Sequence, residues 1–170
     1  MGNLTDRQKQ VLAIGLADPV AVPGIIDLLD NTPLLYSVVK IPYQKVRTLY
    51  TTPVTIIPAP GSGKAIILKS SLVYMKYGSA AYDSVGANDD LTFKYTNAAG
   101  ATLITVETVG FLDQTTNQLR YATSNFSTAI TPIENTPIVA SILTGEIYAA
   151  AGNSDLYIQL GYSVIPTRLP

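Results

Sequence analysis

The sequence contains no cysteine, no histidine and no tryptophan. Disulfide bonds, ordinary zinc and haem sites, and Ser-His-Asp or cysteine-nucleophile catalysis all require a thiolate or an imidazole, so all of them are excluded. The absence of cysteine leaves the redox compartment open. Because most familiar hydrolase chemistry is ruled out, we expect a protein that is not an enzyme and that uses no cofactor.

Charged residues are also scarce. They make up 14% of the chain, whereas globular proteins average roughly 25%. Such a surface is either covered by neighbouring subunits or clothed in neutral polar side chains, and both explanations can hold together. The 11 Tyr against 3 Phe favour subunit contacts, because tyrosine packs its ring while its hydroxyl stays hydrated.

The balance of charge and the lack of long apolar runs exclude two classes of partner. With 11 basic and 12 acidic residues the formal net charge is -1, whereas nucleic-acid binders normally carry a basic excess. No uninterrupted apolar stretch approaches the roughly 18 residues of a membrane span. We therefore expect neither nucleic acid nor a membrane as partner.

The 170 residues suit one β domain preceded by an arm. Residues 1–33 are predicted to form a helical N-terminal arm, with helices over about 6–16 and 23–29. Neither helix is long enough to be stable alone, so the arm must dock on this chain or on another protein. The candidate partner-binding residues are Ile25, Ile26, Leu28 and Leu29 in the arm and Tyr36 just after it.

Residues 34–170 read as a mainly β domain, because β-branched and aromatic segments alternate with turn signals every 8 to 12 residues or so. The predicted strands cover 35–41, 46–51, 54–57, 65–77, 91–95, 102–108, 118–123, 138–143, 146–150 and 156–165. About eight to ten short strands favour an antiparallel β-sandwich of two sheets, most simply a jelly roll, with a barrel as the alternative.

Two loops carry residues that could bind small ligands. Gly61-Ser-Gly-Lys64 resembles part of a phosphate-binding loop, but Pro58 and Ala65 stand where the motif needs glycine and a hydroxyl; a tight hairpin loop is favoured. The 78–90 loop gathers Asp83, Asp89 and Asp90 without the alternate spacing of an EF-hand. These three carboxylates are the only metal candidates, and a solvated loop is the simpler interpretation.

Two wider sets of side chains are also candidate sites. A glycosidase needs two carboxylates across a cleft, and the glutamates available are Glu107, Glu134 and Glu146; Glu107 is expected to face solvent or a neighbouring subunit. Seven tyrosines could form a stacking surface, although cross-strand packing explains them more simply. They are Tyr74, Tyr77, Tyr82, Tyr95, Tyr148, Tyr157 and Tyr162.

The segment Arg47-Thr-Leu-Tyr-Thr-Thr-Pro-Val-Thr-Ile-Ile-Pro-Ala-Pro-Gly-Ser-Gly-Lys-Ala-Ile-Ile67, with the later 74–83 and 156–164 segments, resembles small tailed-bacteriophage virion proteins of the head-decoration or auxiliary capsid kind. The resemblance covers roughly residues 45–165 and rests on strand order and polar β composition. It implies a structural protein of the virion, assembled in the host cytoplasm. Its partners would be itself, as a homotrimer, and the major capsid protein or another virion protein.

Two other functions stay open from the sequence. A tail or connector component would be equally β-rich and oligomeric. A glycan-binding virion appendage would use the loops at one end of the sandwich, above all the 78–90 loop.

Overall fold

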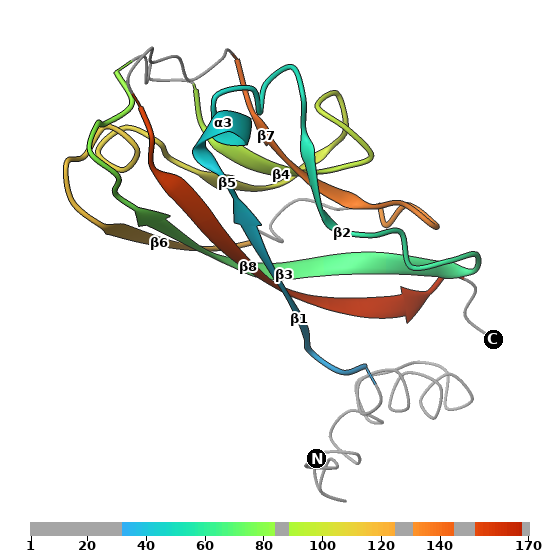
Figure 1. Ribbon diagram of the computed structural model, residues 1–170. Coiled ribbons are helices and arrows are strands. Elements are labelled where there is room, and N and C mark those ends of the chain that lie inside the picture. Colours follow the sequence, from blue (N-terminus) through green and yellow to red (C-terminus); the bar gives the residue numbers. More distant parts are fainter. Residues whose placement is uncertain (1–31, 84–88, 125–130, 145–151, 168–170) are drawn as a thin grey trace, which may run out of the picture.

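The computed structural model describes residues 32–83, 89–124, 131–144 and 152–167 of the chain (Figure 1). The predicted helices of the arm and the predicted strand 146–150 lie outside these residues. In the described part, no helix is long and apolar enough to cross a membrane.

The described residues form eight strands and one short helix, so the domain is mainly β, as expected. The elements are β1 (Leu35–Ile41), α3 (Tyr43–Val46), β2 (Val54–Ile57), β3 (Lys64–Lys76), β4 (Leu91–Tyr95), β5 (Thr102–Val106), β6 (Gln118–Thr123), β7 (Ile138–Ile142) and β8 (Asp155–Pro166). Each strand matches a predicted one to within about two residues at either end.

The strands form two four-stranded antiparallel sheets, in the orders β1-β8-β3-β6 and β2-β7-β4-β5. Strand β1 pairs with β8, β2 with β7, β3 with β6 and β4 with β5. The last four strands therefore pair in reverse order with the first four. The long strands β3 and β8 run beside each other through the first sheet (Figure 1).

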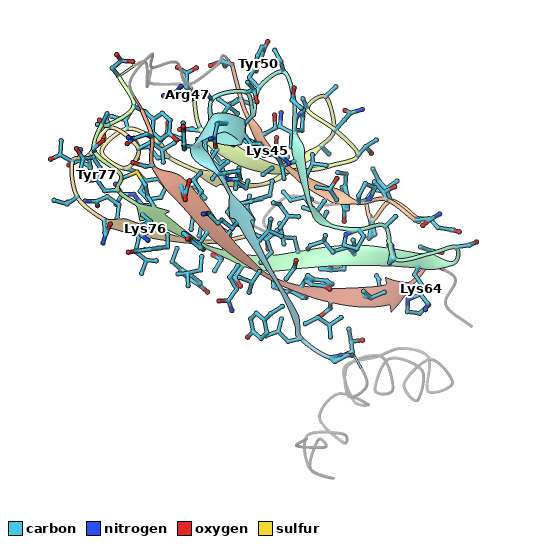
Figure 2. The ribbon with its side chains drawn as sticks, in the orientation of Figure 1. Lys45, Arg47, Tyr50, Lys64, Lys76 and Tyr77 are labelled. Atoms are coloured by element: carbon cyan, nitrogen blue, oxygen red, sulfur yellow. The ribbon has the colours of Figure 1, made fainter. Side chains whose placement is uncertain are left out.

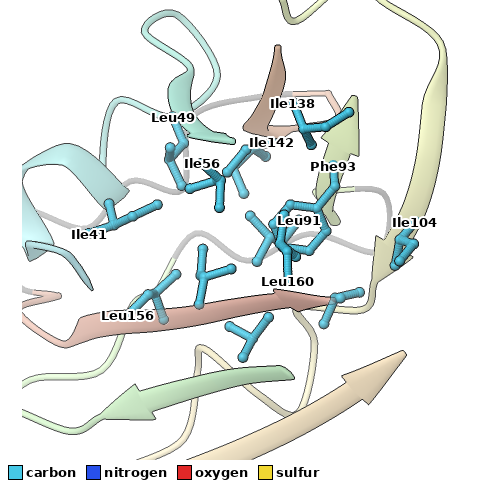
Figure 3. Close-up of a cluster of buried hydrophobic side chains, with 14 of the residues drawn as sticks. Ile41, Leu49, Ile56, Leu91, Phe93, Ile104, Ile138, Ile142, Leu156 and Leu160 are labelled. Carbon is cyan, nitrogen blue, oxygen red and sulfur yellow. The ribbon is translucent and has the colours of Figure 1, made fainter. Parts of the chain in front are cut away.

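The core lies between the two sheets (Figure 3). Strand β8 contributes Leu156, Ile158 and Leu160, all fully buried, which alternate with the half-buried Tyr157 and Gln159. Phe93 and Ile138 face them from the second sheet. Strands β4 and β7 are buried along their whole length, so this sheet is covered on both sides at its centre.

The predicted strand over 46–51 is wrong. Pro42 precedes the helix α3, and the backbone N–H groups of Lys45 and Val46 both donate to its carbonyl, at 2.8 and 3.1 Å. Val46 and Leu49, three residues apart, are both fully buried. Helical spacing places both apolar side chains on the core, whereas a strand would send them to opposite sides.

Candidate interaction surface

Strand β6 turns its two large apolar side chains away from the core. Leu119 and Tyr121 are 56% and 67% exposed, while Gln118, Arg120 and Ala122 on the other side of the strand are half-buried. A sandwich strand normally does the reverse. This inverted pattern marks the outer side of the sheet as a surface to be covered.

The inward side of β6 tolerates polar residues because they have partners. Arg120 donates from Nη2 to the carbonyl of Gly110 at 2.8 Å. Its guanidinium also lies 5.6 Å from the ring centroid of the buried Phe111. The hydrogen bond satisfies the charged guanidinium, and the ring contact packs it against the core. These two contacts stabilise the inverted orientation of β6.

The register extends this apolar surface across all four strands. Val38 lies beside Gln159, Gln159 beside Leu72, and Leu72 beside Tyr121. The next row along the strands runs Lys40, Tyr157, Tyr74 and Leu119. We define the outer face of the sheet β1-β8-β3-β6 as Tyr36, Val38, Leu72, Tyr74, Leu119, Tyr121, Tyr157 and Gln159.

The middle of the outer face holds a shallow groove of about 190 Å³, lined by Val38, Leu72, Tyr74, Tyr157, Ile158 and Gln159. Val38, on one side of the groove, is 68% exposed. The rings of Tyr74 and Tyr157 form a tilted pair with centroids 6.1 Å apart. Apart from Gln159, the side chains that line the groove are apolar or aromatic, and Ile158 borders it from the strand while its own side chain is buried in the core.

One end of the outer face is charged. Lys40 Nζ lies 2.7 Å from a carboxylate oxygen of Asp155 and 5.7 Å from the ring centroid of Tyr157. Asp155 also accepts a hydrogen bond from the backbone N–H of Tyr43 at 3.0 Å. The bond from Lys40 holds the pKa of the Asp155 carboxyl below its usual value. Lys76 on β3 lies in register with Asp155, so it belongs to the same charged end (Figure 2).

At the other end, the chain that enters β1 lies on the outer face. A Cβ at Gly161 would lie 3.4 Å from Tyr36 Cε1 and 3.7 Å from Leu34 Cδ1. The Ser163 hydroxyl donates to the carbonyl of Pro33 at 3.1 Å. The same Cβ would lie 2.6 Å from Ser70 Oγ, so the glycine at 161 makes room for the Ser70 hydroxyl. Leu34 and Tyr36, which are 51% and 58% exposed, lie within contact distance of this position.

The predicted partner residues are only partly described. Tyr36 lies on the outer face, whereas Ile25, Ile26, Leu28 and Leu29 fall outside the described residues. Val38, Leu119 and Tyr121 were not predicted as partner-binding residues from the sequence. The available signal was in β6, where both apolar strand formers share one side with Thr123 and the other side carries a glutamine and an arginine.

The phosphate-loop candidate is occupied by the chain itself. Glu134 accepts hydrogen bonds from the backbone N–H of Gly63 at 2.7 Å and from the Ser62 hydroxyl at 3.3 Å. Asn135 accepts one from the N–H of Gly61 at 3.0 Å. The loop between β2 and β3 is thus held by a neighbouring segment. The predicted tight hairpin is wrong, because β2 and β3 belong to different sheets and the loop crosses between them.

The three metal candidates have different environments. Asp83 is exposed. Asp89 accepts from the Thr144 hydroxyl at 2.5 Å, and Asp90 Oδ1 is buried with no hydrogen-bond partner in the described part of the chain. No group of three metal-ligating side chains gathers within the described ranges, and residues 84–88 lie outside them.

The glutamates and tyrosines have separate environments. Glu107 is exposed, Glu134 holds the loop, and Glu146 lies outside the described residues. Tyr82 and Tyr95 belong to the core, where their hydroxyls donate to backbone carbonyls. Tyr74 and Tyr157 lie on the outer face instead, so the tyrosines do not form one stacking surface.

No protein-family model and no curated protein sequence matches the chain. Among solved structures, a capsid asymmetric unit of cyanophage Pam1 is similar at 13% identity and a TM-score of 0.41, over 78% of this chain and 84% of that one. An arabinose-bound α-L-arabinofuranosidase, MgGH51, is similar at 14% identity and a TM-score of 0.33, over 81% of this chain and 23% of that one.

Proposed function

We propose that this chain is a non-catalytic structural protein of a bacteriophage virion, which decorates or cements the outside of the capsid as an oligomer, most simply a homotrimer. The single observation that carries the proposal is the exposed apolar outer face, in a chain otherwise poor in charge. Contiguous exposed apolar surface of this kind marks a protein contact.

The fold supports the same role. We assign the sandwich to the jelly-roll class, because its strand orders β1-β8-β3-β6 and β2-β7-β4-β5 are those of a long antiparallel hairpin rolled into two sheets. Jelly rolls serve as capsid and lectin domains, among others. The resemblance drawn from the sequence points to the virion among these uses.

A decorating protein gains strength from repetition. Many copies on a symmetric shell bind through individually modest contacts, and linked contacts raise the overall avidity without new chemistry. A mainly apolar contact surface suits this task, because salt does not screen apolar contacts as it screens ion pairs.

Immunogold electron microscopy of intact particles tests the proposal, with an antibody raised against the purified full chain and pre-immune serum as control. We expect gold on the outer surface of the head. Gold confined to the tail would replace the capsid role by a tail or connector role. Particles that contain no copy of the chain by mass spectrometry would overturn the virion role altogether.

A further inference from the structure

We infer that the outer face binds the N-terminal segment 1–31 of a second copy of this chain. The inference rests on the proposed oligomeric role, and it identifies both the surface and its occupant. The segment contains a concentrated apolar run, because Ile25, Ile26, Leu28 and Leu29 lie within five positions. The groove beside Val38, with a volume of about 190 Å³, is lined by side chains of matching chemistry.

The path of the chain decides which copy supplies the segment. Leu34 lies over Gly161. The carbonyl of Pro33 accepts a hydrogen bond from Ser163, which is the next outward-facing residue of β8 after Gly161. Read backwards, the chain therefore moves away from Gln159 and Tyr157, which border the groove. A segment that continues this way leaves its own outer face at the end opposite the apolar rows.

A return to the same face would need a sharp reversal. Four residues separate Leu29 from Leu34. Among them, Pro33 has a fixed φ, and Thr32 before it is confined to extended conformations. The chain is therefore stiff where it would have to turn, which favours delivery of the segment to a neighbouring copy.

The size of the outer face also favours an arm over simple stacking of two sheets. The four strands hold 7, 12, 13 and 6 residues. At about 3.3 Å per residue and 4.8 Å between strands, the sheet covers on the order of 600 Å². A stable interface buries about 800 Å² on each partner. A 31-residue segment from each copy supplies additional area that flat pairing of two such faces lacks.

Charge is compatible with this arrangement. Residues 10–31 contain Asp18, Asp27 and Asp30 and no lysine or arginine. The charged end of the outer face carries Lys40 and Lys76 around the single carboxylate of Asp155. The acidic residues of the segment can thus approach a rim with one excess positive charge while the apolar residues fill the groove.

The absence of cysteine makes the test direct. Two full-length single variants, Leu28→Cys and Val38→Cys, are purified with tags of different mass, mixed, allowed to exchange subunits and cross-linked with a short bis-maleimide. We expect a cross-linked heterodimer on denaturing gels. The matched control pairs Leu28→Cys with Thr105→Cys, an exposed position on the other sheet, and should give at least tenfold less product.

Each other outcome overturns the inference in an identifiable way. Equal product from both pairs would mean random collision. Cross-linking confined within one chain of a Leu28→Cys/Val38→Cys double variant would assign the outer face to its own arm. No product with Val38→Cys, Leu119→Cys or Tyr121→Cys would remove the segment as the occupant. These results concern the isolated chain, so they are independent of whether particles carry the protein.

Discussion

Tyr82 shows how single polar atoms are accommodated in the core. Its side chain is 1% exposed, and its hydroxyl donates to the carbonyl of Ser154 at 2.6 Å. Tyr82→Phe should lower the free energy of unfolding by about 1–2 kcal/mol, because the buried carbonyl loses its partner. Urea unfolding measures this, with Tyr121→Phe as the exposed control. An equal, negligible effect of both changes would show that the bond contributes nothing.

Asp155 predicts a specific dependence on pH. Because Lys40 bonded to it lowers the pKa of its carboxyl, its stabilisation is present above the unfolded pKa of about 3.9 and is lost as pH falls through the lower folded value. Asp155→Asn should therefore unfold at less urea than wild type at pH 7, with the gap closing in acid. Glu107→Gln, an exposed control, should show no such gap. A gap that persists at pH 2 would contradict the ion-pair explanation.

At the scale of elements, unfolding experiments can distinguish the helix α3 and the turn after it from the strand predicted over 46–51. Val46 and Leu49 are both fully buried, whereas Thr48 and Tyr50 are exposed. Leu49→Ala should cost about 2–5 kcal/mol and Leu143→Ala, 40% exposed after β7 in the other sheet, less than about 0.5 kcal/mol. Val46→Ala should also be costly and Tyr50→Ala mild. Urea unfolding of the four variants checks the pattern; a costly Tyr50→Ala would restore the strand.

The same scale explains what the sequence could and could not predict. Turn signals and β-branched runs located all eight described strands, because local propensity and period carry that information. They did not reveal which side of β6 faces inward. That depends on tertiary contacts, because Arg120 donates a hydrogen bond to the Gly110 carbonyl and packs on the Phe111 ring. In β3 the side facing the core switches at a bulge between Leu68 and Ser70. A single alternation along the strand therefore fails, because a bulge shifts the period.

The candidate site was accessible only in part for a related reason. Tyr36 could be chosen because it follows the arm directly, but the outer face is assembled from four strands far apart in sequence. Its rows exist only through the register of β1, β8, β3 and β6. The two sheets also differ in a way that composition hides: Thr92 and Ser141 of the second sheet are fully buried, whereas Val38 and Tyr121 of the first are open.

For the whole molecule, low charge and an open apolar face predict association that resists salt. Salt screens exposed ion pairs, with a Debye length of about 10 Å at 0.1 M and 3 Å at 1 M, but does not weaken apolar contacts. The full chain should have the same mass by light scattering in 0.1 and 1 M NaCl. For the proposed homotrimer, that mass is three times 18.1 kDa.

Matched variants connect this mass to the outer face. Val38→Asp/Tyr121→Asp places two carboxylates on exposed positions of that face, where burial against a partner would leave each charge desolvated and unpaired. Thr102→Asp/Thr105→Asp adds the same charge at exposed positions of β5 on the other sheet. The first variant should fall to the mass of one chain while the second keeps the mass of the wild type. Circular dichroism confirms that both remain folded. If both variants dissociated, net charge would be the cause; if neither did, subunits would meet through a different surface.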